Sequence, residues 1–484
     1  MDSTQIWEKM YIDGNWLNAS NKEMIEVVNP ESQEVITAIP RGQKQDVAHA
    51  VTAAKKVFDS ESWQSLKPSQ RGRALNEIAA NLRENKSELA NIETSDTGKP
   101  LSQSENDVEN SARYFEYYAG MADKMFGETI PVEPGILDYT IREPIGVSAQ
   151  IIPWNYPLQI ASRSIAAAIA TGNTVVVKPA EDASLSILAL GKLIAGNETL
   201  KSALQIVTGY GHEAGDALIN HPDIDHITFT GSYDTGVKVM MAAAKQIVPV
   251  TLELGGKSPH IVFEDSDLDE AAKVIVRSFI QNAGQTCSAG SRLIVHHTVK
   301  EQLLTKLVKL IESISIGPGA ENNELGPIIT KKQFDRIQAM VEQAKLEGAN
   351  VITGGRPAEV IHSRGFYYLP TILDRISPKS EIAQEEVFGP VLTVFDFETE
   401  SEAIGLANGT AYGLVTGIWT KDISRAHRVS NKVKSGQVFI NNYGAAGGVE
   451  MPFGGYKKSG IGREKGVEAL QNYTQLKNIA VKVT

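Results

Sequence analysis

Gly146-Val147-Ser148-Ala149-Gln150-Ile151-Ile152 and Thr174-Val175-Val176-Val177 are short apolar runs that decide the fold of this chain. Both are typical of strands, and residues 160–170 between them have the apolar spacing of a helix. The same alternation continues with a helix over 184–193, a strand over 204–207 and a strand over 227–229 that enters a glycine turn. Strands that alternate with helices build βαβ units, so the sequence predicts an α/β fold with a doubly wound parallel sheet.

Further helical and strand patterns lie on both sides of this block. Asp267 begins a helix in which Glu270 is the capping-box partner. Two helices are expected near the start of the chain, one over 47–58 and one over 71–82 behind the candidate N-cap Ser69. A second α/β block is predicted from a strand over 292–296, a helix over 333–346, a strand over 391–397 and a helix that begins over 401–406.

Two segments, 137–142 and 479–484, alternate strictly between apolar and polar residues. This period of two is typical of strands, and strands at an insertion and at the end of a chain would be edges that need a partner. A ribbon that joins subunits and a plain edge hairpin both satisfy this requirement.

Composition excludes several classes of protein. The chain has 484 residues and 42% hydrophobic residues, which suggests two to four domains around a large core. Its 47 Lys and Arg against 58 Asp and Glu give a net charge of −11, which disfavours nucleic acid and anionic membranes as partners. The uncharged stretch 144–162 contains Pro153 and Pro157, which disfavour a membrane helix. The first residues lack a signal-peptide pattern, so a cytoplasmic protein is expected.

Cys287 is the single cysteine, so an intrachain disulfide is excluded. It lies in the small-residue loop 284–290, where a ligand could approach the sulfur closely. A nucleophile and an inert, buried thiol are both open from this loop alone. No histidine spacing indicates a metal site, so none is expected.

Glu253 and Asn155 are two further candidates for chemistry. Glu253 follows an apolar strand and precedes two glycines, and burial there would raise its pKa toward the range of a general base. Asn155 lies between Pro153 and Pro157, which would hold its amide stiffly as an oxyanion donor. A salt-bridged Glu and a capping Asn are the structural alternatives.

Two glycine-rich turns follow strands, at 209–215 and 231–236. Such turns can present backbone amides and a helix N-terminus to a pyrophosphate, although neither matches GxGxxG and the Walker pattern is absent. Lys178 and Glu181, at the end of a buried strand, could meet ribose hydroxyls or form a solvated ion pair.

Seven motifs, in this order, resemble those of the aldehyde dehydrogenase superfamily. They are Pro153-Trp154-Asn155, Lys178-Pro179-Ala180-Glu181, Phe229-Thr230-Gly231-Ser232, Glu253-Leu254-Gly255-Gly256-Lys257-Ser258-Pro259, Gly284-Gln285-Thr286-Cys287, Glu385-Glu386-Val387-Phe388-Gly389-Pro390 and Pro452-Phe453-Gly454-Gly455. The resemblance covers essentially the whole chain.

The resemblance implies a role for each matching residue. Cys287 would be the nucleophile, Glu253 the general base for hydrolysis, and Asn155 an oxyanion donor together with the Cys287 N–H. The implied cofactor contacts are Ile152, Pro153, Trp154, Lys178, Glu181, Gly211, Gly215, Phe229, Gly231, Ser232, Leu254, Glu386 and Phe388. The implied cofactor is NAD, with NADP possible, and Glu181 beside Lys178 favours NAD because its charge repels a 2′-phosphate.

The resemblance also implies an organisation and a reaction. A dinucleotide-binding domain would comprise 1–123 and 145–254, a catalytic domain 255–455, and an oligomerisation ribbon 124–144 and 456–484, in a homodimer or homotetramer. An aldehyde would be oxidised to the carboxylic acid through a thiohemiacetal and a thioester on the cysteine. A CoA-acylating enzyme and a non-catalytic relative are the alternatives.

The sequence does not identify which aldehyde is the substrate. The expected lining of its tunnel is Tyr156, Gln159, Arg163, Thr286, Ser288 and residues 443–447. Arg163 could attract an acidic semialdehyde or could pair with a structural carboxylate, and the sequence does not decide between these roles.

Overall fold

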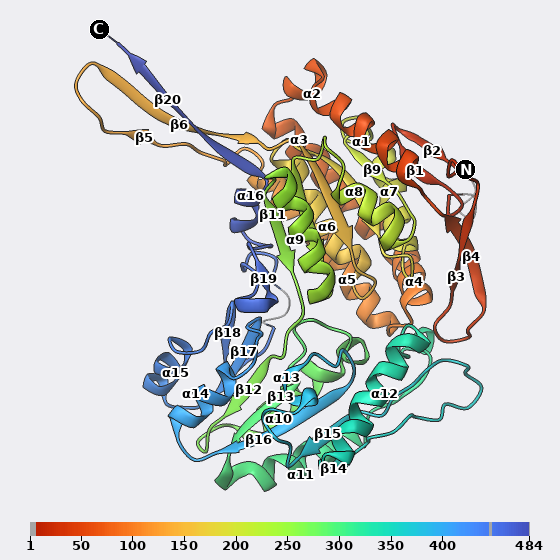
Figure 1. Cartoon of the computed structure of the whole chain (residues 1–484), viewed down its shortest axis with the longest axis vertical. Coiled ribbons are helices and arrows are strands. Elements are labelled where there is room, and N and C mark those ends of the chain that lie inside the picture. Colours follow the sequence, from red (N-terminus) through yellow and green to blue (C-terminus); the bar gives the residue numbers. More distant parts are fainter. Residues whose placement is uncertain (1–5, 445–447, 484) are drawn as a thin grey trace.

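The chain folds around two large β-sheets, with a long antiparallel ribbon that projects from one end (Figure 1). The computed structural model describes residues 6–444 and 448–483. A two-stranded hairpin of β3 (Met24–Val28) and β4 (Val35–Pro40) lies close to the N-terminus.

The first sheet has eight strands in the order β19-β11-β10-β7-β8-β9-β1-β2. Its strands are β1 (Met10–Ile12), β2 (Asn15–Leu17), β7 (Val147–Ile152), β8 (Thr174–Pro179), β9 (Leu204–Ile206), β10 (His226–Thr230), β11 (Val250–Glu253) and β19 (Gly460–Ile461). The five central strands, β11 to β9, are parallel. The chain builds β8 and β9 on one side of β7 and then β10 and β11 on the other. This reversal is the switch point at which doubly wound sheets bind ligands, and it confirms the predicted fold class.

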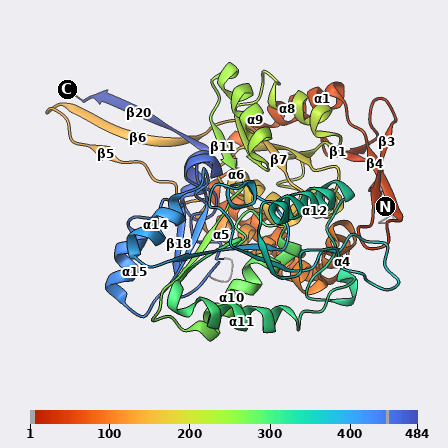
Figure 2. The same ribbon diagram turned by 60° about the horizontal axis from the view of Figure 1, so that its bottom comes forward.

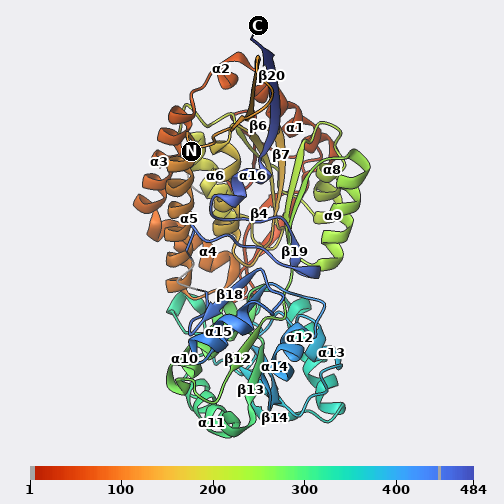
Figure 3. The ribbon, with the colours of Figure 1, turned by 90° about the vertical axis from the view of Figure 1, so that its left-hand side faces the viewer.

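Helices cover both faces of this sheet (Figure 3). One face carries α6 (Pro157–Ala170) and α7 (Leu185–Ala195), with α3 (Pro68–Glu84), α4 (Lys86–Thr97) and α5 (Leu101–Met121) packed outside them. The other face carries α1 (Lys44–Phe58), α8 (Asp216–Ile219) and α9 (Tyr233–Gln246), and the short α2 (Glu61–Gln64) follows α1. Almost every residue of α6 is buried because the helix lies between the sheet and α5.

The start of α3 differs from the prediction. Lys67 is the N-cap and Pro68 is the first helical residue, so the expected N-cap Ser69 lies inside the helix. Proline at the first position needs no backbone N–H and has its φ already set for a helix, so it starts α3 earlier.

The second sheet has seven strands in the order β14-β15-β16-β13-β12-β17-β18. Its strands are β12 (Pro259–Val262), β13 (Arg292–His296), β14 (Asn350–Thr353), β15 (Thr371–Asp374), β16 (Val391–Phe397), β17 (Val415–Trp419) and β18 (Gln437–Ile440). All of them are parallel except β14, which runs antiparallel to β15. The surrounding helices are α10 (Leu268–Ile280), α11 (Lys300–Ile311), α12 (Lys331–Leu346), α13 (Glu381–Gln384), α14 (Glu400–Asn408) and α15 (Ile423–Ser430).

The two sheets are joined directly by residues 254–258, which run from the end of β11 to the start of β12. Gly255 and Gly256 lie in this connection. A side chain on Gly255 would clash with the Glu386 carboxylate, and one on Gly256 would lie 2.6 Å from the Cys287 carbonyl oxygen. The connection therefore lets loops of the second sheet close onto the carboxyl end of the first.

The ribbon consists of β5 (Thr129–Ile130), β6 (Ile136–Pro144) and β20 (Thr474–Lys482), and it extends away from both sheets (Figure 2). β6 and β20 pair antiparallel over nine residues, from Thr474 opposite Pro144 to Lys482 opposite Ile136. Of the segment 456–484 that was expected in the ribbon, β20 forms the ribbon strand. Within 456–473, β19 pairs with β11 of the first sheet and α16 (Glu468–Asn472) packs against α6. Within the described ranges, no helix is long and apolar enough to cross a membrane.

Candidate active site

Cys287 lies in a loop that the chain enters through a sharp turn at the end of α10. Asn282, Ala283 and Gly284 have φ values of 50°, 54° and 74°, which is the left-handed region. Gly284 cannot carry a side chain, because a Cβ would lie 2.2 Å from the Gly389 carbonyl. The Cys287 side chain is partly buried against the apolar cluster of Leu414, Val415 and Phe453.

Asn155 is fixed directly beside this loop. Its Nδ2 donates to the Gln285 carbonyl at 3.0 Å, and Asn282 Nδ2 donates to the Asn155 carbonyl at 2.9 Å. The primary amide of Asn155 has two N–H groups, so the second stays available for an oxyanion. The two-proline loop thus holds the Asn155 amide against the loop that carries Cys287.

Glu253 is the last residue of β11 and is only 2% exposed. Neither of its carboxylate oxygens has a hydrogen-bond partner. Burial raises the pKa of Glu253 well above its usual range, and the charge of Glu464 raises it further, against the effect of Arg163. A buried carboxylate without a partner is costly, and such groups are concentrated at functional sites.

Electrostatic coupling connects the thiol to this carboxylate. Burial, together with the charges of Glu386 and Glu253, raises the pKa of Cys287 to about 12, and Arg163 opposes them. The structure therefore brings Cys287, Glu253 and Asn155 together at the junction of the two sheets.

Arg163 is a buried structural partner in this region. It forms an ion pair with Glu464, whose other oxygen accepts from Thr228 Oγ1 at 2.8 Å. A weaker hydrogen bond joins Arg163 Nη2 to Thr230 Oγ1 at 3.3 Å. Of the two roles left open by the sequence, the structure supports the structural pair.

The adenosine side of the candidate cofactor site lies at the ends of β8 and β9. Lys178 Nζ lies 2.8 Å from Glu181 Oε2, and the Gly211 N–H donates to Glu181 Oε1 at 3.4 Å. Burial lowers the pKa of Lys178. Gly211 and Gly215 are the first and last residues of the next helical turn. No atom lies within 4 Å of the position that a Cβ on Gly211 would occupy, so the space beside this glycine is open.

The phosphate side lies where β10 leads into α9. Ser232 caps α9 by accepting from the Thr235 N–H, and the Gly231 N–H donates to the Glu253 carbonyl at 3.0 Å. A side chain on Gly231 would clash with the Phe229 ring, and one on Gly236 would lie 2.6 Å from Leu254. Open backbone at a helix N-terminus suits a pyrophosphate.

A further group of expected cofactor contacts lies in the 385–390 loop, which faces the end of β7. Glu386 Oε1 accepts from the Gly256 N–H at 3.0 Å, and burial raises the pKa of Glu386 to about 7. Phe388 is held at a left-handed φ of 57°, and its ring packs edge-on against Trp154 at 5.3 Å. Ile152 is buried at the end of β7 and Pro153 follows it, half-buried.

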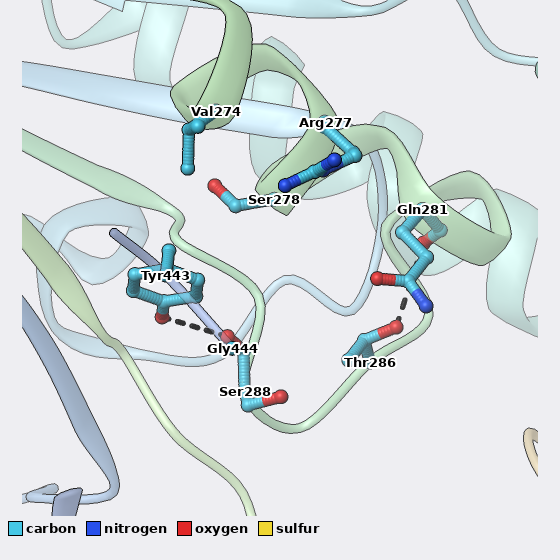
Figure 4. A pocket seen from close by; sticks show the side chains of 8 residues that line it. All are labelled: Val274, Arg277, Ser278, Gln281, Thr286, Ser288, Tyr443 and Gly444. Atoms are coloured by element: carbon cyan, nitrogen blue, oxygen red, sulfur yellow. Dashed lines mark hydrogen bonds between the residues drawn. The ribbon is translucent and has the colours of Figure 1, made fainter. Parts of the chain in front are cut away.

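A pocket opens beside the thiol loop (Figure 4). Its lining residues are Val274, Arg277, Ser278, Gln281, Thr286, Ser288, Tyr443 and Gly444. The sequence predicted Thr286, Ser288, Tyr443 and Gly444 for the aldehyde tunnel, and residues 445–447 lie outside the described residues. Tyr156 contacts this lining through a 2.8 Å hydrogen bond to Thr286.

The four α10-side lining residues were missed from the sequence. Val274, Arg277, Ser278 and Gln281 follow the i, i+3, i+4, i+7 spacing of one helix face. That spacing, in the helix that leads to the cysteine loop, is the signal that could have found them. In the part of the chain that the structure describes, no group of three His, Cys, Asp or Glu side chains could hold a metal ion.

Comparison with known proteins agrees with this geometry. The aldehyde dehydrogenase family profile matches residues 16–479. Betaine aldehyde dehydrogenase of Bacillus subtilis is 42% identical, with 98% of this chain and 97% of that protein covered. Aminoaldehyde dehydrogenase 1, peroxisomal, of Pisum sativum is 42% identical, with coverages of 97% and 95%.

A solved structure gives the same result for the fold and the cofactor. The NAD⁺ complex of aldehyde dehydrogenase from Bacillus cereus superposes with a TM-score of 0.96 at 40% identity, covering 99% of this chain and 98% of that one. Its cofactor, NAD⁺, is the one that the resemblance implies for this chain. The chain belongs to the aldehyde dehydrogenase family and is an NAD-dependent enzyme that oxidises aldehydes to carboxylic acids.

Proposed function

We propose that Cys287, Glu253 and Asn155 divide the work of aldehyde oxidation between them. The observation that carries this assignment is the Glu253 carboxylate, which is buried, has no hydrogen-bond partner and acts electrostatically on the only cysteine. A structural glutamate in such a position would be expected to have a partner, because an unpaired buried carboxylate destabilises the fold.

The first step is addition of the Cys287 thiolate to the aldehyde carbon, which forms a C–S bond and places a negative charge on the carbonyl oxygen. The free N–H of Asn155 Nδ2 and the Cys287 N–H donate to that oxygen. When bound, NAD would supply the acceptor for the hydride that leaves this carbon, and Cys287 would then hold the acyl group as a thioester. Glu253 then takes a proton from water, the water oxygen attacks the thioester, and the C–S bond breaks to release the acid and the thiolate.

We assign the cofactor contacts to groups around the switch point of the first sheet. The adenosine ribose would contact Lys178 and Glu181, and the nicotinamide ribose would contact Glu386 and Phe388. The phosphates and the adenine would be bordered by Gly211, Gly215, Phe229, Gly231 and Ser232. The cleft itself would be lined by Ile152, Pro153, Trp154 and Leu254. The open backbone at Gly211 and the α9 N-terminus fit a dinucleotide. The Glu181 charge favours NAD over NADP, because a 2′-phosphate would be repelled.

Hydrolysis, rather than transfer to CoA, is the proposed second half-reaction. The thiol of CoA ionises readily and can attack the thioester as a thiolate, whereas a water molecule needs a base to become a comparable nucleophile. The raised pKa of the Glu253 carboxyl suits it to that task. A non-catalytic relative would have no need to keep this costly carboxylate beside a thiol.

We also propose that the enzyme is cytoplasmic and that it is a homo-oligomer, a dimer or a tetramer. The ribbon supports the homo-oligomer. Leu137, Leu476 and Val481 on its strands are 45%, 59% and 41% exposed. Exposed apolar side chains on an extended strand mark a surface to which a second chain can bind. In this division of the chain, the first sheet binds the dinucleotide, the second carries the thiol and the ribbon joins subunits.

The proposed roles are tested by Glu253→Gln, which keeps the size of the side chain but cannot accept a proton. We expect the steady-state rate to fall by about 10²–10⁴-fold, the range for loss of a general base. Because acylation then outruns hydrolysis, stopped-flow fluorescence should show a burst of about one NADH per active site.

Two comparisons make this experiment decisive. Cys287→Ala should show neither turnover nor burst, and CoA added to the wild type should not appear in the product. Wild-type turnover in Glu253→Gln, or accumulation of acyl-CoA, would refute the assignment of Glu253.

A further inference from the structure

The pocket beside Cys287 has a chemical character that goes beyond the general reaction. Its lining combines Val274, Arg277 and Ser278 of α10, and Gln281 just after the end of that helix, with the residues on either side of the thiol, Thr286 and Ser288 (Figure 4). A substrate whose carbonyl is at the sulfur therefore has its tail against α10. This inference rests on the proposed role of Cys287.

Several polar groups of the pocket are already engaged. Ser278 Oγ bonds to His260 Nε2 at 2.8 Å and to the Ile275 carbonyl at 2.7 Å. Tyr443 donates its hydroxyl to the Ser288 carbonyl at 2.7 Å, and the Thr286 hydroxyl bonds to Tyr156. These groups shape the wall but have little remaining capacity for a ligand.

Three hydrogen-bond donors in the pocket remain unused. Among the residues that the structure describes, no ion pair or hydrogen bond engages the Arg277 guanidinium, the Gln281 amide or the Ser288 hydroxyl. Arg277 lies in the last turn of α10 and Gln281 is the residue that directly follows this helix, and both line the same pocket.

The charge of the lining has one sign. Arg277 is the only charged residue among the eight, and no carboxylate is present in the described lining. A guanidinium with neighbouring neutral donors matches the two oxygens of a carboxylate. It would repel a quaternary ammonium, the group that gives betaine aldehyde its charge.

We propose that this enzyme acts on ω-oxo acids, aldehydes that carry a carboxylate at the far end, and that Arg277 with Gln281 binds that carboxylate. Arg277 thus sets specificity without taking part in the chemistry at Cys287. From the sequence, Arg163 was the candidate partner for an acidic semialdehyde. In the structure Arg163 is paired with Glu464, whereas the cation that lines this pocket is Arg277 on α10.

The test compares kcat/KM for 4-oxobutanoate and 5-oxopentanoate with that for their methyl esters, which have the same shape and no charge. The wild type should prefer the acids, and higher salt should raise KM for the acids more than for the esters. Arg277→Gln should lower the acid-to-ester ratio by about tenfold, as expected for loss of a charge-assisted contact. Arg277→Glu should lower it further and favour betaine aldehyde.

Lys273→Gln is the matched control, because Lys273 is exposed on the same helix and is not part of the pocket lining. It should leave the ratio unchanged. An unchanged ratio in Arg277→Gln, or a wild type that prefers betaine aldehyde, would overturn the substrate assignment. A wild type that oxidises neutral aldehydes without a preference for acids overturns this inference alone, whereas one that oxidises no aldehyde with NAD overturns the proposed function.

Discussion

At the scale of single residues, the free enzyme holds its nucleophile in the unreactive form. The Cys287 pKa of about 12 is far above neutral pH, because the sulfur is desolvated and lies near Glu386 and Glu253. Only a thiolate adds readily to a carbonyl. Burial therefore keeps most of the Cys287 thiol protonated at neutral pH, which slows its reaction with adventitious electrophiles.

This protection has a measurable pH dependence. A thiol with a pKa of about 12 gains thiolate about tenfold per pH unit across neutral and mildly alkaline pH, whereas an ordinary cysteine levels off above about 8.5. We expect the rate of inactivation of the free enzyme by iodoacetamide to rise in this way from pH 7 to 9. Glu386→Gln should accelerate it, because one of the charges that raise the pKa is removed. A rate that reaches a plateau below pH 8.5 would contradict the buried, uncharged thiol.

At the scale of elements, a buried ion cluster holds the helices that support the site. Lys99 follows α4 and its Nζ lies 2.6 Å from Asp107 Oδ2 on α5 and 3.1 Å from Glu93 Oε1 on α4. The same Nζ lies 4.3 Å from the ring centre of Tyr156, which bonds to Thr286 beside the thiol. The cluster therefore links α4 and α5 to the two-proline loop that carries Asn155.

Loss of the lysine should destabilise this linkage. Lys99→Met leaves two buried carboxylates without their cation, which costs about 3–5 kcal/mol. We expect a large drop in the thermal midpoint, measured by scanning calorimetry at one scan rate. Lys55→Met on α1 is the control, since its exposed i,i+4 pair with Asp59 contributes little. Equal midpoints for the two variants would show that the cluster is not stabilising.

Helices and strands also differ in how far the sequence alone could predict their positions and contacts. The alternation of strand and helix patterns predicted the doubly wound sheet, because local spacing determines these elements. The grouping of Cys287, Glu253 and Asn155 in one site was implied by the family resemblance. The partner of Arg163 could not be found in this way, since Glu464 reaches it only when β19 adds to the first sheet. Arg277 was missed for a related reason: the face a helix presents to a pocket depends on what packs against its other faces.

At the scale of the whole molecule, the ribbon should set the oligomeric state. Leu476→Asp with Val481→Asp places charges on its exposed apolar side chains, and we expect light scattering at micromolar concentration to show a smaller species than the wild type. Gln475→Asp, an equally exposed polar position on the same strand, is the control. A monomeric wild type, or a double variant of unchanged size, would contradict the role of the ribbon.

The order of strands also fixes when the enzyme can become active during its synthesis. β6 emerges early from the ribosome, but its partner β20 ends the described chain, and β19 and Glu464 come only slightly before it. Until these last segments appear, β11 has a free edge, Arg163 is a buried cation without its carboxylate, and β6 has only the short strand β5 to pair with. Such long-range pairing closes late in folding. A nascent chain that has not yet reached β20 therefore lacks both the ion pair behind Glu253 and the complete ribbon, so we expect catalysis and assembly to begin together, once β19 and β20 have formed.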